Sequence, residues 1–373
     1  MDRKSFFKNI KRVVLKIGTN LLTENGEISM DKFRKVVDEI VILKSYVRDL
    51  VVVTSGAIGA GYTLILKKEK PLTIPLKQAS ASIGQVVIMR NYMDLLGEHG
   101  YVVSQILLTD GVLNDRSRYV NARNTLNTLL QFGVIPIVNE NDTVAVDEIK
   151  FGENDRLAAL VTSLCDAELL ILLSDVDGFY RNYDDTDKRE LVRVIEHITP
   201  EIENEARNPG SGFSTGGMIT KLKAAKICTH HGIPLLIAGG QNPDIIKRLF
   251  TGQEEGTLFL PSKEELMKNK KRWIHLNSRA KGKIGIDENA VKALVKDNRS
   301  LLPRGVCSVE GSFSNFDTVE IVGPAGNVVA KGIVNYNHTE IEKIKGCHSS
   351  EIEGILGYRH YDVVVHKDNL ALS

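Results

Sequence analysis

Residues 138–143 read Val-Asn-Glu-Asn-Asp-Thr and complete a short apolar run that begins at residue 134. Such a run is typical of a strand buried in a sheet. Asparagine and aspartate are costly to bury unless a polar group meets them, so their position at the end of this strand needs a partner. Open α/β sheets bind their ligands at the carboxyl ends of the strands. The stretch therefore predicts an α/β fold with a polar small-molecule site, and a second polar stretch at residues 152–156 (Gly-Glu-Asn-Asp-Arg) supports this prediction.

The same kind of apolar run recurs along the chain. Further buried-type strands are expected at residues 12–17, 50–54, 102–108, 169–173 and 233–237. Helices are expected between them, at residues 29–48, 76–98, 114–131, 155–165 and 217–231. Because these strands are nearly continuously apolar and alternate with helices, the sequence predicts an α/β sandwich with a mostly parallel sheet.

The pattern changes after residue 260. Residues 261–272 are polar and carry five basic side chains, so we expect a linker between a domain of residues 1–260 and a domain of residues 273–373. Short β-type runs with glycines between them fill the second domain, at residues 305–309, 319–322, 328–333 and 362–365. Residues 323–327 (Gly-Pro-Ala-Gly-Asn) predict a hairpin turn.

The composition excludes several classes of protein. A net charge of +1 gives no overall attraction to nucleic acid or membranes. No apolar stretch is long enough for a signal peptide or a membrane span, so a cytoplasmic location is expected. The four cysteines are scattered, which argues against a disulfide framework and against a metal site: Cys165, Cys228, Cys307 and Cys347.

Three features suit a bound phosphate. Lys16 ends a strand just before a glycine, and its ammonium needs a polar partner. Ser55 begins a glycine-containing turn at the start of a helix, where backbone N–H groups form an anion site. Lys221 lies in the first turn of a helix opened by the glycine-rich residues 210–217, where a cation opposes the helix dipole unless a polyphosphate is bound.

Each feature also has a simpler interpretation. Lys16 can extend to the sheet edge, Ser55 can belong to a tight turn, and residues 210–217 can form a surface loop without a ligand. That loop matches neither the Walker A pattern nor the dinucleotide fingerprint. Ser174 and Asp175 follow another strand and fit either a nucleotide site or a simple turn.

Together these motifs resemble the amino acid kinase family over residues 12 to about 260. The resemblance rests on residues 14–19, 53–57, 139–142, 152–155, 174–175 and 215–221. Residues 273–373 resemble a PUA domain, a small β-barrel-like module found in RNA-modifying enzymes. The resemblance implies an amino acid kinase-type α/β/α sandwich followed by a PUA-like domain. It also implies transfer of the γ-phosphoryl of ATP to the side-chain carboxylate of L-glutamate, the first step of proline biosynthesis from glutamate.

The resemblance also implies roles for individual residues. Lys16 and Lys221 would neutralise phosphoryl oxygens, Asp155 would hold both lysines, and Mg²⁺ would bridge the ATP phosphates. Ser55, Asp142 and Asn154 match glutamate-binding positions, where Asp142 would meet the α-ammonium while Ser55 and Asn154 donate to carboxylate oxygens. The implied ATP-binding positions are Lys16, Ser174, Asp175, Thr215, Gly216, Gly217, Met218, Ile219, Thr220 and Lys221. The family further implies a homo-oligomer, dimer or tetramer, and proline as a feedback inhibitor.

Other functions compete with this interpretation. Kinases of aspartate, acetylglutamate, carbamate, UMP and isopentenyl phosphate share the fold, so the acceptor depends on the pocket. An RNA-binding role of the PUA-like domain is less favoured than a regulatory or stabilising one, because residues 273–373 carry 12 basic and 12 acidic side chains and so lack a basic footprint. A ligand sensor without activity is disfavoured by the presence of Lys16, Asp155 and Lys221.

Overall fold

The computed structural model describes residues 2–24, 26–65, 73–109, 116–144, 153–182, 188–207, 217–262 and 280–372. The chain divides into two compact units, Met1–Leu266 and Met267–Ser373. Residues 263–272 of the expected linker lie outside the described residues. In the part of the chain that the structure describes, no helix is long and apolar enough to cross a membrane.

The first unit is built on an eight-stranded sheet with the order β10-β12-β11-β7-β1-β4-β6-β5. Only the β11–β12 pair is antiparallel among these neighbours, so the predicted mostly parallel sheet is confirmed. The strands are β1 (Arg12–Ile17), β4 (Asp49–Val53), β5 (Val103–Leu108), β6 (Ile135–Glu140), β7 (Leu169–Ser174), β10 (Val194–Ile195), β11 (Leu235–Gly239) and β12 (Thr257–Phe259).

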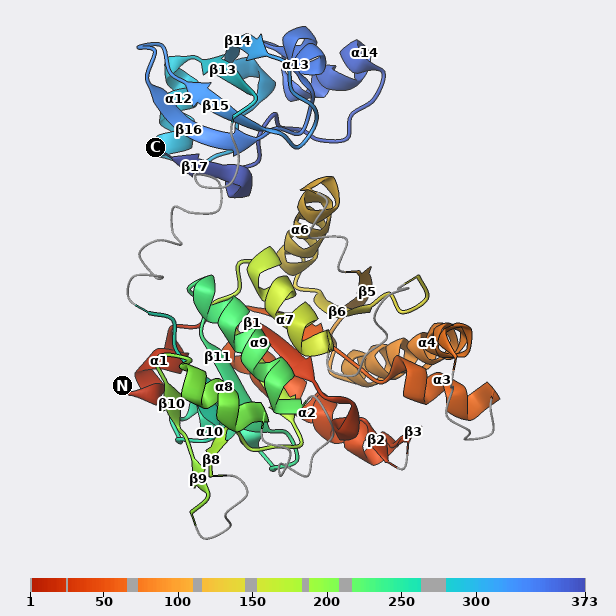
Figure 1. The fold of residues 1–373 in the computed structure, drawn as a ribbon. Helices are drawn as coiled ribbons and strands as arrows, with labels where there is room; N and C mark the ends of the chain where they lie inside the picture. The colour runs from red at the N-terminus through yellow and green to blue at the C-terminus, as the bar shows by residue number, and fades with distance from the viewer. Residues whose placement is uncertain are drawn as a thin grey trace. The chain divides into compact units, whose positions relative to one another are not determined.

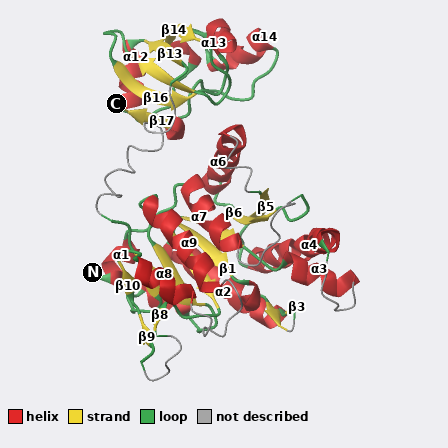
Figure 2. Ribbon diagram, in the orientation of Figure 1, coloured by secondary structure: helices red, strands yellow, loops and turns green. Residues whose placement is uncertain are grey.

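Helices cover both faces of this sheet (Figures 1 and 2). One face packs against α1 (Arg3–Lys8), α2 (Met30–Tyr46), α4 (Ile74–Glu98) and α10 (Ile245–Phe250). The other face packs against α6 (Arg116–Gln131), α7 (Glu153–Leu164), α8 (Pro200–Arg207) and α9 (Gly217–His230). Successive side chains of a strand point to opposite faces. In β1, Leu15 enters the first core and Val14 the second, so Lys16 faces the layer of α7 and α9.

Two helices on the first face cross with direct backbone contact. A Cβ atom on Gly61 of α3 (Ala57–Ile65) would lie 1.7 Å from the carbonyl oxygen of Ser80. A Cβ atom on Gly84 of α4 would lie 1.8 Å from the carbonyl oxygen of Ala57. Because no side chain fits at either position, the two glycines set how closely α4 approaches the carboxyl end of β4.

Several short elements were not predicted from the sequence. They include α1, α8, α10, β10, β12 and two small hairpins, β2 (Thr23–Glu24) with β3 (Glu27–Ile28) and β8 (Tyr180–Arg181) with β9 (Glu190–Leu191). Each strand of the two hairpins has two residues, which is too short to give a periodic pattern in the sequence.

The second unit is a five-stranded sheet with the order β14-β13-β15-β16-β17. Its strands are β13 (Gly282–Ile286), β14 (Val306–Gly311), β15 (Thr318–Val322), β16 (Val328–Ile333) and β17 (Leu370–Leu372), and its helices are α12 (Glu288–Val295), α13 (His338–Ile344) and α14 (Ile352–Leu356). The hairpin turn expected at residues 323–327 joins the antiparallel β15 and β16. The small β-rich domain is confirmed.

One predicted strand of this unit is wrong. Residues 362–365 form only an isolated bridge between Val365 and Leu301. Val364 and Val365 are completely buried, so their apolar character serves the core of the unit rather than a strand pairing. The sequence pattern missed β13, in which Gly282 and Gly285 interrupt the apolar run.

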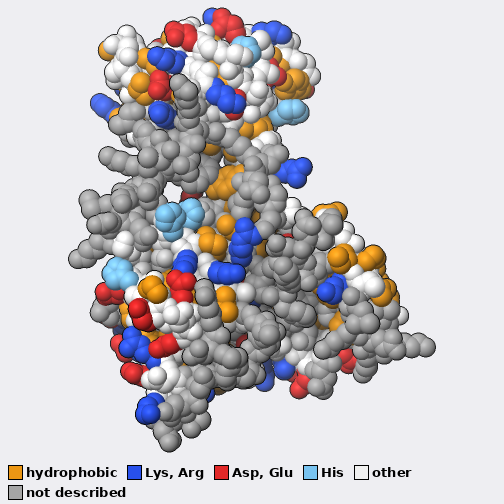
Figure 3. Space-filling model, in the orientation of Figure 1, with side chains coloured by type: hydrophobic (Ala, Val, Ile, Leu, Met, Phe, Trp, Pro, Cys, Tyr) orange, Lys and Arg blue, Asp and Glu red, His pale blue; other side chains and the backbone are white. Residues whose placement is uncertain are grey.

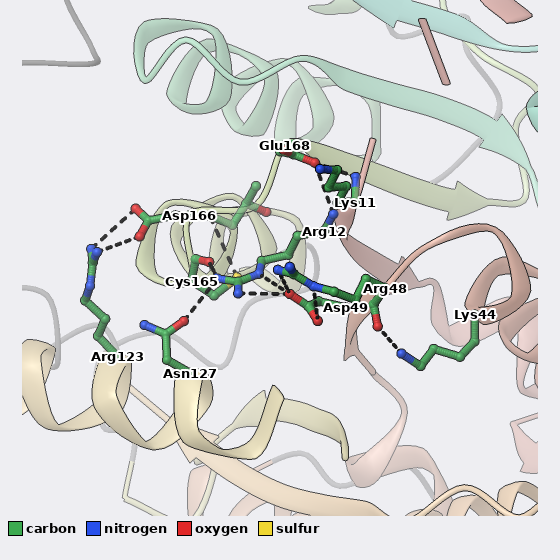
Figure 4. Close-up of polar contacts among 11 residues, drawn as sticks. Lys11, Arg12, Lys44, Arg48, Asp49, Arg123, Asn127, Cys165, Asp166 and Glu168 are labelled. Atoms are coloured by element: carbon green, nitrogen blue, oxygen red, sulfur yellow. Dashed lines mark hydrogen bonds and ion pairs between the residues drawn. The ribbon is translucent and has the colours of Figure 1, made fainter. Parts of the chain in front are cut away.

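The amino ends of the central strands are tied together by a charged network (Figure 4). Arg12, which begins β1, donates from Nε to Asp49 Oδ2 at 3.0 Å and from Nη1 to Asn127 Oδ1 of α6 at 3.0 Å. Arg48 adds a second ion pair to Asp49 at 2.7 Å. Burial raises the pKa of Asp49, but the hydrogen bonds from Arg48 and Arg12 outweigh it and lower the pKa overall. The network therefore joins β1, β4 and α6 at the edge opposite to the predicted site.

We predict that Asp49→Ala lowers the free energy of unfolding by about 3 kcal/mol at pH 7, because it leaves the half-buried Arg12 without its anion. Urea unfolding followed by circular dichroism measures this loss. Arg48→Ala is the control and should cost about 0.5 kcal/mol, since the Arg48 side chain is 68% exposed.

The same comparison has a pH dependence. The pKa of Asp49 is lower in the folded protein than in the unfolded chain. Its contribution to the free energy of unfolding is therefore fully present above the pKa of the unfolded chain, and it is lost as the pH falls through the pKa of the folded protein. The difference in the free energy of unfolding between Asp49→Ala and the unmodified protein should therefore decrease at acidic pH. A difference that stays constant down to pH 2 would contradict the role of the ionised carboxylate.

Candidate active site

Three charged side chains meet at the carboxyl end of the sheet, and we call them the charged triad: Lys16, Asp155 and Lys221. Lys16 Nζ lies 2.7 Å from Asp155 Oδ1, and Lys221 Nζ lies 3.3 Å from Asp155 Oδ2. Thr220 Oγ1 donates to the same Oδ2 at 2.8 Å. The side chains of Lys16, Asp155 and Lys221 are only 9%, 1% and 8% exposed.

The secondary structure explains this meeting. Lys16 is the last residue but one of the central strand β1, and it faces α7 and α9 by strand alternation. Asp155 lies in the first turn of α7, where the helix dipole favours a carboxylate. Lys221 directly follows the first turn of α9, near the positive end of the helix dipole, and Asp155 offsets the resulting penalty.

The charges of the triad are strongly coupled. Burial alone raises the pKa of Asp155, but Lys16 and Lys221 overcome this effect and lower the pKa to about 2. Burial lowers the pKa of Lys221, and the attraction of Asp155 partly opposes it. Asp155 is therefore ionised across the physiological range. Because two lysines share one carboxylate, the triad carries a net positive charge and is suited to bind an additional anion.

Next to the triad lies a group of three amide side chains that we call the amide cluster: Gln85, Asn139 and Asn154. Asn154 Nδ2 approaches the carbonyl oxygen of Thr54 at 2.8 Å, Ser55 Oγ at 2.8 Å and Asn139 Oδ1 at 3.1 Å. Asn139 Nδ2 donates to Gln85 Oε1 at 2.8 Å. The cluster joins the carboxyl ends of β4 and β6 to α4 and α7.

Asp142 follows β6 at the same edge of the sheet. Burial raises the pKa of Asp142 to about 6. Within the described residues, no hydrogen bond or ion pair reaches its carboxylate. A half-buried carboxylate of this kind is stabilised by a cationic group of a ligand.

A third polar group follows β7, the other neighbour of β1. Ser174 Oγ donates to Asp175 Oδ1 at 2.9 Å, and Asn20 Nδ2 donates to Asp175 Oδ2 at 2.8 Å. Burial raises the pKa of Asp175, but these two hydrogen bonds lower it overall. The group lies beside the triad, because Leu173 pairs with Ile17 of β1.

The structure brings most of the expected site residues to one edge of the sheet. Gly217, Met218, Ile219 and Thr220 form the first turn of α9, which carries Lys221. Thr215 and Gly216 lie outside the described residues.

Sequence reasoning missed Asn20 and Gln85 and gave no separate role to Asn139. The signal for Gln85 was available, because it is a polar residue on the buried stripe of α4 between Ala81 and Ile88.

Comparison with known proteins agrees with this geometry. The amino acid kinase family profile matches residues 11–239, and the PUA domain profile matches residues 282–356. Glutamate 5-kinase of Thermoanaerobacter sp. (strain X514) is 44% identical over 367 residues, which cover 97% of both chains. Glutamate 5-kinase of Moorella thermoacetica (strain ATCC 39073) is 46% identical over 362 residues, 96% of both chains.

A solved structure supports the fold alone. Carbamate kinase from Giardia lamblia, bound to AMP-PNP, aligns with a TM-score of 0.50 and 17% identity, over 68% of this chain and 100% of that chain. Together with the full-length relatives, the fold and the site define the class of protein: this is a kinase with a C-terminal PUA domain. The chain belongs to the amino acid kinase family, and within it to the glutamate 5-kinases.

We predict that Asp155→Asn lowers kcat about 10²- to 10³-fold, because the two lysines lose the carboxylate that orients them. ATP affinity should not weaken, since the change increases the positive charge at the site. Steady-state kinetics and calorimetric titration with a non-hydrolysable ATP analogue separate the two effects. Thr220→Val removes one hydrogen bond to Asp155 and should cost about fivefold in kcat. Weaker binding of the analogue with an unchanged kcat would contradict the positioning role.

Proposed function

We propose that this chain transfers the γ-phosphoryl group of ATP to the side-chain carboxylate of L-glutamate and forms L-glutamyl 5-phosphate, the first step of proline biosynthesis from glutamate. The observation that carries the proposal is the charged triad beside the amide cluster at the carboxyl end of the sheet. The full-length likeness to glutamate 5-kinases supports the same reaction.

The main obstacle to this reaction is electrostatic, because an anionic acceptor must approach a polyanion. Lys16 and Lys221 neutralise phosphoryl oxygens, and Asp155 holds the two ammonium groups in place before the substrates arrive. The site needs no general base, since the glutamate carboxylate is ionised near neutral pH. Ser174, Asp175 and the residues from Thr215 to the first turn of α9 bind the nucleotide.

Mg²⁺ enters this scheme with ATP. Both oxygens of Asp155 are occupied by Lys16, Lys221 and Thr220. Among the described residues, no group of three or more His, Cys, Asp or Glu side chains is placed to hold a metal ion. The phosphates themselves would therefore supply most of the ligands of the ion, which suits the preference of Mg²⁺ for few protein ligands.

The acceptor binds on the side of Ser55, Asp142 and Asn154. Asp142 is the only one of these three that carries a charge, and its carboxylate has no partner in the described part of the chain. It therefore takes the α-ammonium of glutamate. Proline is expected to compete at this pocket as a feedback inhibitor, and an inhibition assay with proline measures this.

We also propose that the chain forms a homo-oligomer. Hydrophobic side chains gather over α3 and α4 on the face shown in Figure 3. Val86 and Met93 of α4 are 68% and 58% exposed, and Leu64 of α3 is also exposed. Exposed apolar patches of this kind mark protein interfaces. Light scattering of the purified chain, compared with Met93→Glu, measures the oligomeric state.

A panel of acceptors tests the proposed reaction. Purified protein with ATP and Mg²⁺ is given glutamate, aspartate, acetylglutamate or UMP, with hydroxylamine present to trap an acyl phosphate. Hydroxamate should form with glutamate alone, and Lys221→Ala should remove it while the protein stays folded. Preference for another acceptor would overturn the proposed substrate, and normal turnover of Lys221→Ala would overturn the role of the triad.

The pKa of Asp142 predicts a pH dependence. Only the ionised carboxylate binds an ammonium group, and burial raises its pKa to about 6. The KM for glutamate should therefore rise about tenfold for each pH unit below 6, while kcat changes little. Asp142→Asn should have a high KM that does not vary between pH 5 and 7. A KM of the unmodified protein that is constant over this range would contradict the assignment.

A further inference from the structure

The three amides of the amide cluster form a continuous chain of hydrogen bonds across the edge of the sheet. Gln85 comes from α4 on one face, Asn139 ends β6, and Asn154 comes from α7 on the opposite face. Gln85 and Asn139 are buried, with only 7% and 2% of their surface exposed. The chain therefore connects the two helical layers directly behind the acceptor side of the site.

Two backbone groups fix the orientation of these amides. The N–H of Glu140 can only donate, and it lies 2.9 Å from Asn139, so the atom facing it is Oδ1. The carbonyl oxygen of Thr54 can only accept, and it lies 2.8 Å from Asn154, so the atom facing it is Nδ2. The Nδ2 of Asn139 must then face Gln85, which has to offer its Oε1.

This orientation determines what Asn154 offers to a ligand. Its Nδ2 is already engaged by the carbonyl oxygen of Thr54, by Ser55 Oγ and by Asn139 Oδ1. In the described part of the chain no hydrogen bond reaches its Oδ1. The sequence-based expectation that Asn154 donates to a substrate carboxylate therefore does not fit the geometry. The Oδ1 atom is an acceptor, and an acceptor suits an ammonium group.

We infer that Gln85 is a positioning residue of the acceptor site, which orients Asn139 and through it Asn154, so that Asn154 Oδ1 accepts a hydrogen bond from the α-ammonium of the substrate. The inference rests on the proposed function and deepens it, because it assigns the recognition of the ammonium group. Gln85 reaches this position because Gly61 and Gly84 let α3 and α4 cross at backbone contact. Gln85 bonds to the cluster through Oε1, and its buried Nε2 has no hydrogen-bond partner among the described residues.

The test compares glutamate with glutarate, which keeps both carboxylates and lacks the ammonium group. Gln85→Met has a similar length and offers no oxygen acceptor to Asn139. We expect the KM for glutamate to rise about tenfold, which is the loss of one buried hydrogen bond. The KM for ATP and kcat should stay within about twofold. The inhibition constant of glutarate should stay nearly constant, so the preference for glutamate over glutarate should fall about tenfold.

Two further variants separate positioning from a general loss of structure. Gln85→Glu keeps an oxygen that accepts from Asn139 and should restore most of the affinity for glutamate. Gln105→Met makes the same substitution at an exposed position of β5 and should leave all constants unchanged. Thermal unfolding of each variant shows whether the fold is retained.

The outcomes distinguish the inference from the proposed function. If the unmodified protein does not phosphorylate glutamate, the proposed function fails and the inference fails with it. If the unmodified protein is active and Gln85→Met keeps its preference for glutamate over glutarate, only the inference is overturned. Equal loss of glutamate and glutarate binding would also overturn it, because the effect would then be unrelated to the ammonium group.

Discussion

The carboxylate of Asp155 is the interaction on which the rest of the site depends. Each of its oxygens pairs with a different lysine, and the two lysines come from segments near the two ends of the first unit. Two buried ammonium groups without this anion would repel each other and would each lose their hydration. The first turn of α7 holds Asp155 where the helix dipole also supports its charge. A single side chain therefore makes the buried positive charge stable before any nucleotide is bound.

The sheet order explains how the proposed site would be divided between ATP and glutamate. β1 lies in the middle with Lys16 at its end, β7 on one side brings Ser174 and Asp175, and β4 and β6 on the other side bring Ser55 and Asn139. The proposed nucleotide side and the proposed acceptor side are thus formed by the ends of strands that lie on either side of β1 and Lys16. The charged network of Arg12 and Asp49 fastens the same strands at the opposite edge, so it restrains their relative position without contacting a substrate.

Much of this arrangement could be predicted from the sequence, because buried parallel strands are continuous apolar runs and polar residues at their ends are conspicuous. The roles of Lys16, Asp155 and Lys221 needed the family resemblance, since no local pattern brings residues so far apart together. The polar Gln85 on the buried stripe of α4 could have been noticed, but its contact with Asn139 could not be predicted, because it depends on how closely α3 and α4 cross. The strand predicted at residues 362–365 is wrong because the buried Val364 and Val365 belong to a loop, and a loop with buried side chains can have the same apolar composition as a strand.

The central place of β1 has a consequence for the synthesis of the protein. Val13 pairs with Leu50 on one side and with Leu169 on the other, so one edge of this apolar strand stays open until β7 has left the ribosome. At typical elongation rates this interval lasts many seconds. An open apolar edge is a template for pairing with other chains. The strand that carries Lys16 is thus exposed to wrong pairing in the nascent chain until β7 has been made.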